Sequence, residues 1–511
     1  MSVARHGPTD QERSRIAGFG ERLTQAVQRL LAETSEGTIV LAILAGFVPL
    51  WMIFWIVSTA PLDAHVDAGE ASVWAQHFAF GYKHPPMTAW LFELWFAVFP
   101  RERWASDLLI VTSNAVALAI SWRLMRDHLD KNRALLGLVA LVLVPLYTVK
   151  AEVLNANTVT APFWAATLLF YLRARRGLGL ADALLAGAFA GLTMLGKYWA
   201  VFLFAGMAVA AVTGPGTRRF WRSPAPYAMA AGAIIFVAPH VWWALGHRES
   251  MRFAQSVINQ LPYDETLWKS AYYIGGAIAY VVMPLIFLAA LKPSAAALGD
   301  IAWPADEIRR QALLLLLVPL ALPALVNLII PYRLTPDWTF PNWALLPVVL
   351  YGSPYLTIDA RTTARAGLVG LGLVLAIVAA SPAIGYVRFE GSHDRDRRYA
   401  RQIAEMAEHI AGQPIKFISG SPDMIAALPF YIPQARPLTG TEKVGVLLIV
   451  CASNDAPCRQ SAIARARDSA KEGGRTTTVT FARSFLGLSG PPETFSITVL
   501  PSPQAGLGPN E

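Results

Sequence analysis

One short polar segment of this 511-residue chain carries the side chains best suited to acid–base and phosphate chemistry. Asp63, Asp67 and Glu70 lie within about two turns of a helix, and Lys83 and His84 follow them before a Pro-Pro pair. One carboxylate can accept the proton of a hydroxyl group, and the two basic side chains can neutralise a departing phosphate. The segment therefore suits a reaction between a hydroxyl group and a phosphate-linked group. A solvated loop, in which Asp caps a helix and Pro-Pro makes a turn, accounts for the same residues.

Composition indicates what must hold this segment in place. Hydrophobic residues make up 54% of the chain and charged residues 15%, and the mean hydropathy is +0.41. A soluble protein carries about 25% charged residues, and a single soluble core stops growing near about 250–300 residues. Lipid must therefore surround much of the chain. The net charge of +8 comes as short basic clusters between apolar stretches, a pattern that orients membrane proteins and does not predict nucleic-acid binding.

Eleven apolar stretches are candidates for membrane spans, because a span requires about 20 apolar residues. They cover residues 38–60, 105–122, 134–149, 158–172, 181–195, 200–212, 227–245, 270–291, 312–330, 343–356 and 366–386. Several are short or interrupted by Gly and Pro. We therefore predict a mainly α, polytopic membrane protein with about eleven transmembrane helices.

The distribution of cations predicts the orientation. Basic residues follow the second, fourth, sixth, eighth and tenth stretches, as Arg123 and Arg126 do. The positive-inside rule places these loops in the cytoplasm and the protein in the inner membrane of a bacterium. Residues 1–37 then form a cytoplasmic amphipathic N-terminus. Residues 61–104 form the first periplasmic loop, and everything after residue 386 is periplasmic.

The predicted membrane domain covers residues 38–386. The chain after it, residues 387–511, has the pattern of a small soluble α/β domain. Within residues 387–511, the predicted strands cover residues 416–419, 444–450, 475–483 and 494–500, and the predicted helices cover residues 423–428 and 456–471. Both cysteines of the chain, Cys451 and Cys458, lie here. In an oxidising compartment they can form a disulfide, and two unrelated thiols are the alternative.

The order of several motifs resembles that of a known family. In the first loop the matching residues are Asp67, Trp74, Gly81, Tyr82, His84, Pro85, Pro86, Ala89, Trp90 and Leu91. Later matches are Leu195-Gly196-Lys197-Tyr198, Ser223-Pro224-Ala225-Pro226-Tyr227 and Pro341-Asn342-Trp343. Together they resemble the family 39 and lipid A aminoarabinose transferase glycosyltransferases of the GT-C superfamily, relatives of the dolichyl-phosphate-mannose-protein mannosyltransferases. The resemblance extends over about residues 38–356 and implies a GT-C-like membrane domain.

The resemblance implies an inverting transfer. In that family the first-loop Asp is the general base, and Asp67 is the matching position. An acceptor hydroxyl is deprotonated and attacks the anomeric carbon of a hexosyl or pentosyl group, and polyprenyl phosphate leaves as an anion that cations stabilise. The implied partners are a polyprenyl-phosphate-linked sugar, membrane lipids, and a lipid, polysaccharide or protein acceptor of the envelope.

Departures from the family's pattern affect the predicted site. Ala68 stands where the family has Glu, so Glu70 is the candidate to replace that residue. Lys83 stands where the family has an acidic residue, which favours phosphate contact over metal binding in this loop. No metal ligands are predicted, and a divalent metal cofactor is left open. The family's acidic residue in the second external loop has no match in residues 154–158, and the nearest acid is Glu152.

Two further cations are candidates for binding the donor phosphate. Lys197 lies near the external end of the fifth stretch, and a Lys at mid-bilayer costs about 2.5–3.5 kcal/mol. Its ammonium group either holds the lipid phosphate or extends to the interface. Arg333, in a Pro-rich external loop, is a candidate for the phosphate or for a sugar carboxylate.

We predict a glycosyltransferase with two catalytic carboxylates and four donor-phosphate-binding residues. These are Asp67 and Glu70, and Lys83, His84, Lys197 and Arg333. The alternative is a transporter or flippase of lipid-linked sugars, which favours broken helices and charges at the bilayer midplane, often in repeated halves. The sequence shows no such repeat, and its polar clusters lie at the external ends of the predicted spans.

Overall fold

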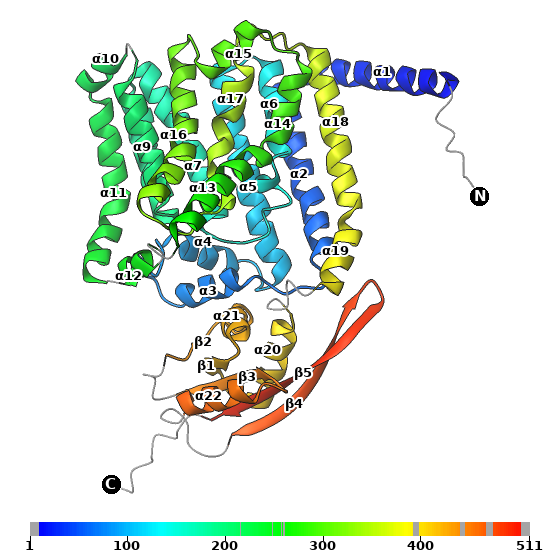
Figure 1. The fold of residues 1–511 in the computed structure, drawn as a ribbon, viewed down its shortest axis with the longest axis vertical. Coiled ribbons are helices and arrows are strands. Elements are labelled where there is room, and N and C mark those ends of the chain that lie inside the picture. The colour runs from blue at the N-terminus through cyan, green and yellow to red at the C-terminus, as the bar shows by residue number, and fades with distance from the viewer. Residues whose placement is uncertain are drawn as a thin grey trace.

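The computed structural model describes residues 10–214, 216–247, 249–256, 258, 261–391, 398–439, 445–466 and 474–501. It consists of a helical body with a smaller α/β domain at one end (Figure 1). Helix α1 (Asp10–Glu33) projects sideways from the opposite end of the body (Figure 1). The predicted fold class, mainly α with a small C-terminal α/β domain, is confirmed.

Five helices of the described chain are long and apolar enough to cross a membrane. They are α2 (Glu36–Ser58), α5 (Arg103–His128), α11 (Ala225–Gly246), α16 (Glu307–Ile329), and α18 (Ala360–Ala379) taken together with α19 (Ser381–Glu390). The pair α13 (Tyr263–Tyr280) and α14 (Val282–Ala290) is a sixth candidate that is bent by 52° at its junction. The chain is a multi-pass membrane protein.

The other predicted spans also fall on helical structure, but in shorter or more polar pieces. These are α6 (Lys131–Val142) with the 3₁₀ helix η1 (Pro145–Tyr147), α7 (Ala156–Gly177), α8 (Leu180–Gly196), α9 (Ala200–Val212), and the 3₁₀ helix η2 (Pro336–Leu345) with α17 (Leu346–Tyr351). Helix α6 has 12 residues, which at 1.5 Å per residue covers about 18 Å of the about 30 Å hydrocarbon core. The count of eleven spans is therefore not confirmed, because apolar composition does not fix helix length.

Short helices cover both ends of the body. Helices α3 (Val66–Ala75), α4 (Met87–Phe96) and α12 (Glu249–Ser256) lie at the end next to the α/β domain (Figure 1). Helices α10 (Thr217–Arg222) and α15 (Ala295–Ala302) lie at the end next to α1. The loop after α2, which contains α3 and α4, and the C-terminal domain thus share one side, opposite the N-terminal helix. This relative placement agrees with the predicted alternation of loops, and the compartments themselves remain predictions.

The C-terminal domain is built on a five-stranded sheet in the order β2-β1-β3-β5-β4. Its strands are β1 (Ile415–Gly420), β2 (Arg436–Pro437), β3 (Val446–Ala452), β4 (Arg475–Phe485) and β5 (Leu488–Leu500). Strand β1 pairs in parallel with β2 and β3, and β5 is antiparallel to β3 and β4. The helices are α20 (Ala400–Ala411), α21 (Pro422–Tyr431) and α22 (Ala456–Ala466).

Each strand and helix predicted for this domain is present, and the structure adds α20 and β2. Residues 444 and 467–471 of the predicted elements lie outside the described residues. Cys451 and Cys458 form a disulfide, which joins the end of β3 to the first turn of α22. Of the two alternatives that the sequence left open, the disulfide is the one present.

Candidate functional site

Helix α3 carries three side chains of the candidate site on one face. Asp67, Glu70 and Trp74 are spaced at i, i+3 and i+7, which places them on the same side of the helix. His65 caps α3, and its Nδ1 atom accepts a 3.1 Å hydrogen bond from the backbone N–H of Asp67. A nitrogen that accepts a hydrogen bond carries no proton. His65 Nδ1 therefore forms no ion pair with Asp67 Oδ1, although the two atoms are 3.7 Å apart. No Lys or Arg of the described chain pairs with Asp67, which leaves its carboxylate open to a substrate proton.

A cavity of about 590 Å³ lies beside this face of α3. Its lining comes from the first loop, the N-terminus of α7, the junction of α8 and α9, and the segment around η2. The polar members include Asp67, Glu70, His84, Thr88, Asn155, Asn157, Lys197, Tyr198 and Tyr332. Four of the six predicted site residues, which come from distant parts of the sequence, therefore line one cavity.

Lys197 is the Lys or Arg side chain that lines this cavity. It directly follows α8, and its Nζ atom donates a 2.8 Å hydrogen bond to Asn157 Oδ1. Nζ also lies 4.3 Å from the ring centre of Trp338 and 5.6 Å from that of Trp199. None of these three contacts is a carboxylate, so no direct ion pair competes with an anionic ligand for the ammonium group.

His84 lines the same cavity but contributes no positive charge at neutral pH. Its ring packs against Trp74 and Phe253, with ring centres 5.5 Å and 4.8 Å away. Burial, together with the nearby cations Lys83 and Lys197, lowers the pKa of His84 to about 4. The imidazole is therefore neutral, and it can donate a hydrogen bond to a phosphate.

Lys83 and Glu70 form an ion pair at the rim of the site. Lys83 Nζ lies 2.8 Å from Glu70 Oε1, and the ammonium group is 4.5 Å from the ring centre of Phe253. The two side chains are 40% and 35% exposed, and exposed pairs contribute only about 0–1 kcal/mol. Glu70 lines the cavity and Lys83 does not. Lys83 contacts a phosphate, or Glu70 accepts a proton, only when this weak pair opens.

The structure does not bring the remaining candidates into the cavity. Arg333 is exposed and does not belong to the lining. Asp63 points toward the C-terminal domain, where its Oδ2 atom accepts a 3.3 Å hydrogen bond from the backbone N–H of Arg401. Burial raises the pKa of the Asp63 carboxyl. Within the described ranges, no group of three or more His, Cys, Asp or Glu side chains is arranged to hold a metal ion.

A second cavity, polar and of about 200 Å³, shares the lining residues Asn155 and Asn157 with the first. The charged members of its lining are Lys150, Glu152, Asp337 and Arg388. Sequence reasoning missed this cavity because its walls come from the loop before α7, from η2 and from α19. The polar run at residues 154–158 was the available signal, and nothing in it indicated the partners from η2 and α19.

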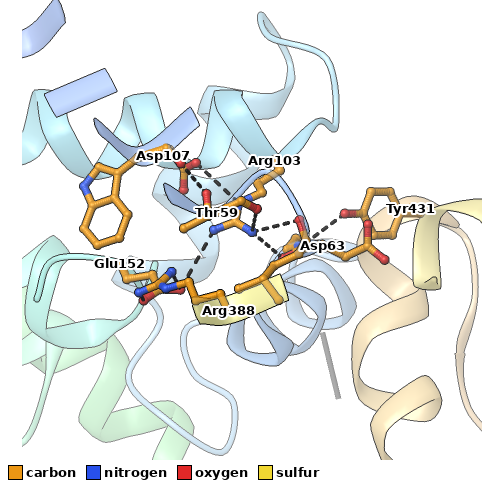
Figure 2. A network of polar contacts seen from close by, with 10 residues as sticks. Thr59, Asp63, Arg103, Asp107, Glu152, Arg388 and Tyr431 are labelled. Carbon is orange, nitrogen blue, oxygen red and sulfur yellow. Dashed lines mark hydrogen bonds and ion pairs between the residues drawn. The ribbon is translucent and has the colours of Figure 1, made fainter. Parts of the chain in front are cut away.

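A largely buried network connects this second cavity to the first external loop (Figure 2). Arg388 donates two hydrogen bonds to the Glu152 carboxylate, at 3.0 and 2.9 Å. Arg103 lies beside this pair, with its Nη2 atom 3.9 Å from Glu152 Oε1. Its Nη1 atom donates to the backbone oxygens of Thr59, Leu62 and Asp63, at 3.0, 2.8 and 3.1 Å. The network fixes the start of the first loop against α5 and α19.

The opposite face of α3 packs against α21 of the C-terminal domain. At Gly69, a Cβ atom would meet the backbone oxygen of Ala426 at 1.9 Å. Ser72 and Gln76 donate hydrogen bonds to three backbone oxygens of the domain. These belong to Pro429, Pro433 and Ala435, at 2.6, 3.0 and 2.7 Å. Helix α3 therefore lies between the cavity and the C-terminal domain.

Sequence comparison relates the chain to membrane glycosyltransferases. A family model for dolichyl-phosphate-mannose-protein mannosyltransferase matches residues 83–243. The chain is 27% identical over 315 residues to the lipid A galacturonosyltransferase RgtD of Rhizobium johnstonii, an alignment that covers 60% of this chain and 63% of RgtD. It is 25% identical over 445 residues to the lipopolysaccharide core galacturonosyltransferase RgtB of the same organism, covering 78% of this chain and 86% of RgtB. The match to RgtD spans less than two thirds of that relative.

Structural comparison establishes the fold. The crystal structure of ArnT from Cupriavidus metallidurans bound to undecaprenyl phosphate matches with a TM-score of 0.57 and 14% identity, over 91% of this chain and 98% of that one. ArnT in the apo state matches with the same TM-score and 13% identity, over 90% and 98%. At this identity the likeness concerns the fold alone, and it confirms the GT-C-like architecture expected from the sequence.

Proposed function

We propose that this chain is a membrane glycosyltransferase of the GT-C superfamily. In this proposal it moves a sugar, with inversion, from a polyprenyl-phosphate donor to an acceptor of the cell envelope. Transfer takes place on the periplasmic face, and Asp67 is the general base. The observation that carries the proposal is that Asp67 and Lys197, a carboxylate and a cation, line the same cavity.

In the proposed reaction, the Asp67 carboxylate accepts the proton of the acceptor hydroxyl. The resulting oxygen nucleophile forms a bond to the anomeric carbon, and the bond between that carbon and the phosphate oxygen breaks. The electron pair of that bond leaves with polyprenyl phosphate. Because the departing phosphate is a stable anion, the step needs positive charge and hydrogen bonds, not a strong general acid.

Lys197 supplies the positive charge and neutral His84 supplies a hydrogen bond in this proposal. The apolar part of the lining, which includes Phe202, Val326 and Ile330, suits the polyprenyl chain next to the phosphate. Glu70 and Lys83 remain paired until a ligand separates them. Arg333 is exposed and does not line the cavity, and we assign it no role in this reaction.

The relatives suggest the substrates. RgtD and RgtB are named as galacturonosyltransferases of lipid A and of the lipopolysaccharide core, so an acidic sugar and a lipopolysaccharide acceptor are the classes that we propose. The crystallised ArnT holds undecaprenyl phosphate, and we propose the same lipid class as the carrier here.

The test is Asp67→Asn in the full-length protein, reconstituted in nanodiscs with a donor lipid and envelope lipids as acceptors. A positioned general base contributes about 10²–10⁴-fold to rate, so transfer should fall by at least about a hundredfold while donor binding stays unchanged. Asp264→Asn, at an exposed aspartate on α13, is the matched control and should transfer normally. Unchanged transfer by Asp67→Asn would contradict the assignment of Asp67 and move the base to Glu70, the other carboxylate of the lining. Donor movement across the bilayer without any transfer would favour the transporter alternative.

A further inference from the structure

The polar cavity next to the first one has no role in the reaction described so far. Its volume of about 200 Å³ suits one sugar ring, and its lining contains both hydrogen-bond donors and acceptors. Asn155 and Asn157 stand between the two cavities and line both. Lys197 Nζ bonds Asn157 at 2.8 Å, so a phosphate bound at Lys197 would lie next to the wall that the two cavities share.

Three of the four charged groups in this cavity are already engaged. Arg388 is bound through two nitrogens to Glu152, and Asp337 accepts a hydrogen bond from the Tyr280 hydroxyl. Lys150 differs from them. It lies in the turn after η1, its side chain is exposed, and it forms no ion pair with any residue that the structure describes.

The amide groups of Asn155 and Asn157, which line both cavities, are suited to a ligand that accepts hydrogen bonds. The Oδ1 atom of Asn155 accepts the backbone N–H of Asn157 at 2.9 Å, and the Oδ1 atom of Asn157 accepts from Lys197 at 2.8 Å. Each oxygen has used one of its two lone pairs, and the Nδ2 groups are available to donate to a ligand. Sugar hydroxyls and carboxylates both accept such bonds.

We propose that the polar cavity binds the sugar ring of the donor and that Lys150 selects a uronic acid by binding its carboxylate. This inference rests on the proposed function. Because Glu152 is paired with Arg388, Lys150 is the cation of the lining that a ligand with one negative charge can meet. A second phosphate group would meet Glu152 and Asp337 at close range, whereas these carboxylates suit sugar hydroxyls. The names of the relatives agree with an acidic sugar.

The test compares three lipids that differ only at the sugar: undecaprenyl phosphate, its galactosyl form and its galacturonosyl form. Galactose and galacturonic acid differ at a single carbon, which carries a hydroxyl in one and a carboxylate in the other. Dissociation constants are measured for the full-length protein in nanodiscs and for Lys150→Gln and Lys150→Arg. Lys416→Gln, at an exposed lysine of β1, is the control.

A charge-assisted hydrogen bond is worth about tenfold or more in affinity. We expect the wild type and Lys416→Gln to prefer the galacturonosyl lipid over the galactosyl lipid by at least about that factor. Lys150→Gln should bind both forms equally, Lys150→Arg should keep part of the preference, and binding of bare undecaprenyl phosphate should not change.

The proposal is overturned if the wild type binds the two sugar lipids equally, or if Lys150→Gln keeps the preference. Weaker binding of all three lipids by Lys150→Gln also contradicts it, because the bare lipid has no carboxylate. If the wild type binds none of the three lipids, the proposed function itself fails. The two failures are therefore distinguishable.

Discussion

The two faces of α3 show how one ten-residue helix serves two different surroundings. Asp67, Glu70 and Trp74 face the cavity with large or charged side chains. The residues that face α21 have the same i, i+3 and i+7 spacing. Gly69 has no side chain there, and Ser72 and Gln76 donate hydrogen bonds to backbone oxygens of the domain. One face is open to a ligand, and the other is closed by the domain.

The contrast teaches what positions the proposed base. An isolated helix shorter than about 12–15 residues is marginal in water, so α3 depends on its packing for its place. The packing on the far side comes from the C-terminal domain, and the cavity face makes fewer contacts within the protein. Substitution of Asp67 should therefore affect transfer alone, and changes on the domain face should affect stability and transfer together.

The largest expected effect on the domain face comes from Gly69→Ala. The added methyl group would overlap the backbone oxygen of Ala426, and overpacking of this kind costs about 1–3 kcal/mol. We expect a lower melting temperature and reduced transfer, measured by thermal denaturation in detergent and by the nanodisc assay. The matched control is Gly275→Ala in α13, where nothing lies within 4 Å of the new atom. Equal melting temperatures for the two variants would show that α21 does not pack closely against α3 at Gly69.

A smaller effect is expected from Gln76→Ala. The substitution removes the amide that bonds Pro433 and Ala435, and a hydrogen bond of this kind contributes about 0.5–1.5 kcal/mol. The change should lower the free energy of unfolding by about that amount and reduce transfer slightly. Gln402→Ala, at an exposed glutamine of α20, removes the same group without these bonds. A loss of transfer as large as that of Asp67→Asn would contradict the division between the two faces.

The smallest effect concerns pH and the cavity face. The pKa of His84 is about 4 in the folded protein and about 6.5 in an unfolded chain. Since the folded value is the lower one, the stability that neutral His84 contributes is present above about pH 6.5 and is lost as the pH falls toward 4. The melting temperature of the wild type should fall over this interval more steeply than that of His84→Asn. Parallel curves for the two proteins would show that the imidazole is not held neutral by its surroundings.

Much of this architecture could be predicted from the sequence, because composition and periodicity are local properties. The scarcity of charge indicated lipid, and the apolar stretches coincide with helices. The number of spans could not be predicted, since α6 and α17 are too short to cross a bilayer although their residues are apolar. The second helix of the first loop, α4, is formed by the apolar residues that come directly after the Pro-Pro pair.

The candidate site was predictable where one segment carries several of its residues. Asp67, Glu70 and His84 belong to a single loop, and Lys197 belongs to a motif that resembles the family's. Long-range contacts were not predictable. Nothing in the sequence near Lys150 indicates that Asp337 and Arg388 lie around the same cavity, and nothing near Gly69 indicates that α21 packs against it. These contacts depend on the tertiary fold, which a single sequence does not display.

The packing of α21 on α3 also has a consequence for how the protein is made. Synthesis proceeds from the N-terminus, so the membrane helices and the first loop emerge from the ribosome well before residues 422–431, which form α21. A growing chain can therefore insert most of its helices while α3 still lacks the surface on which it rests. Catalytic competence should arrive last, when the end of the polypeptide folds back against its beginning.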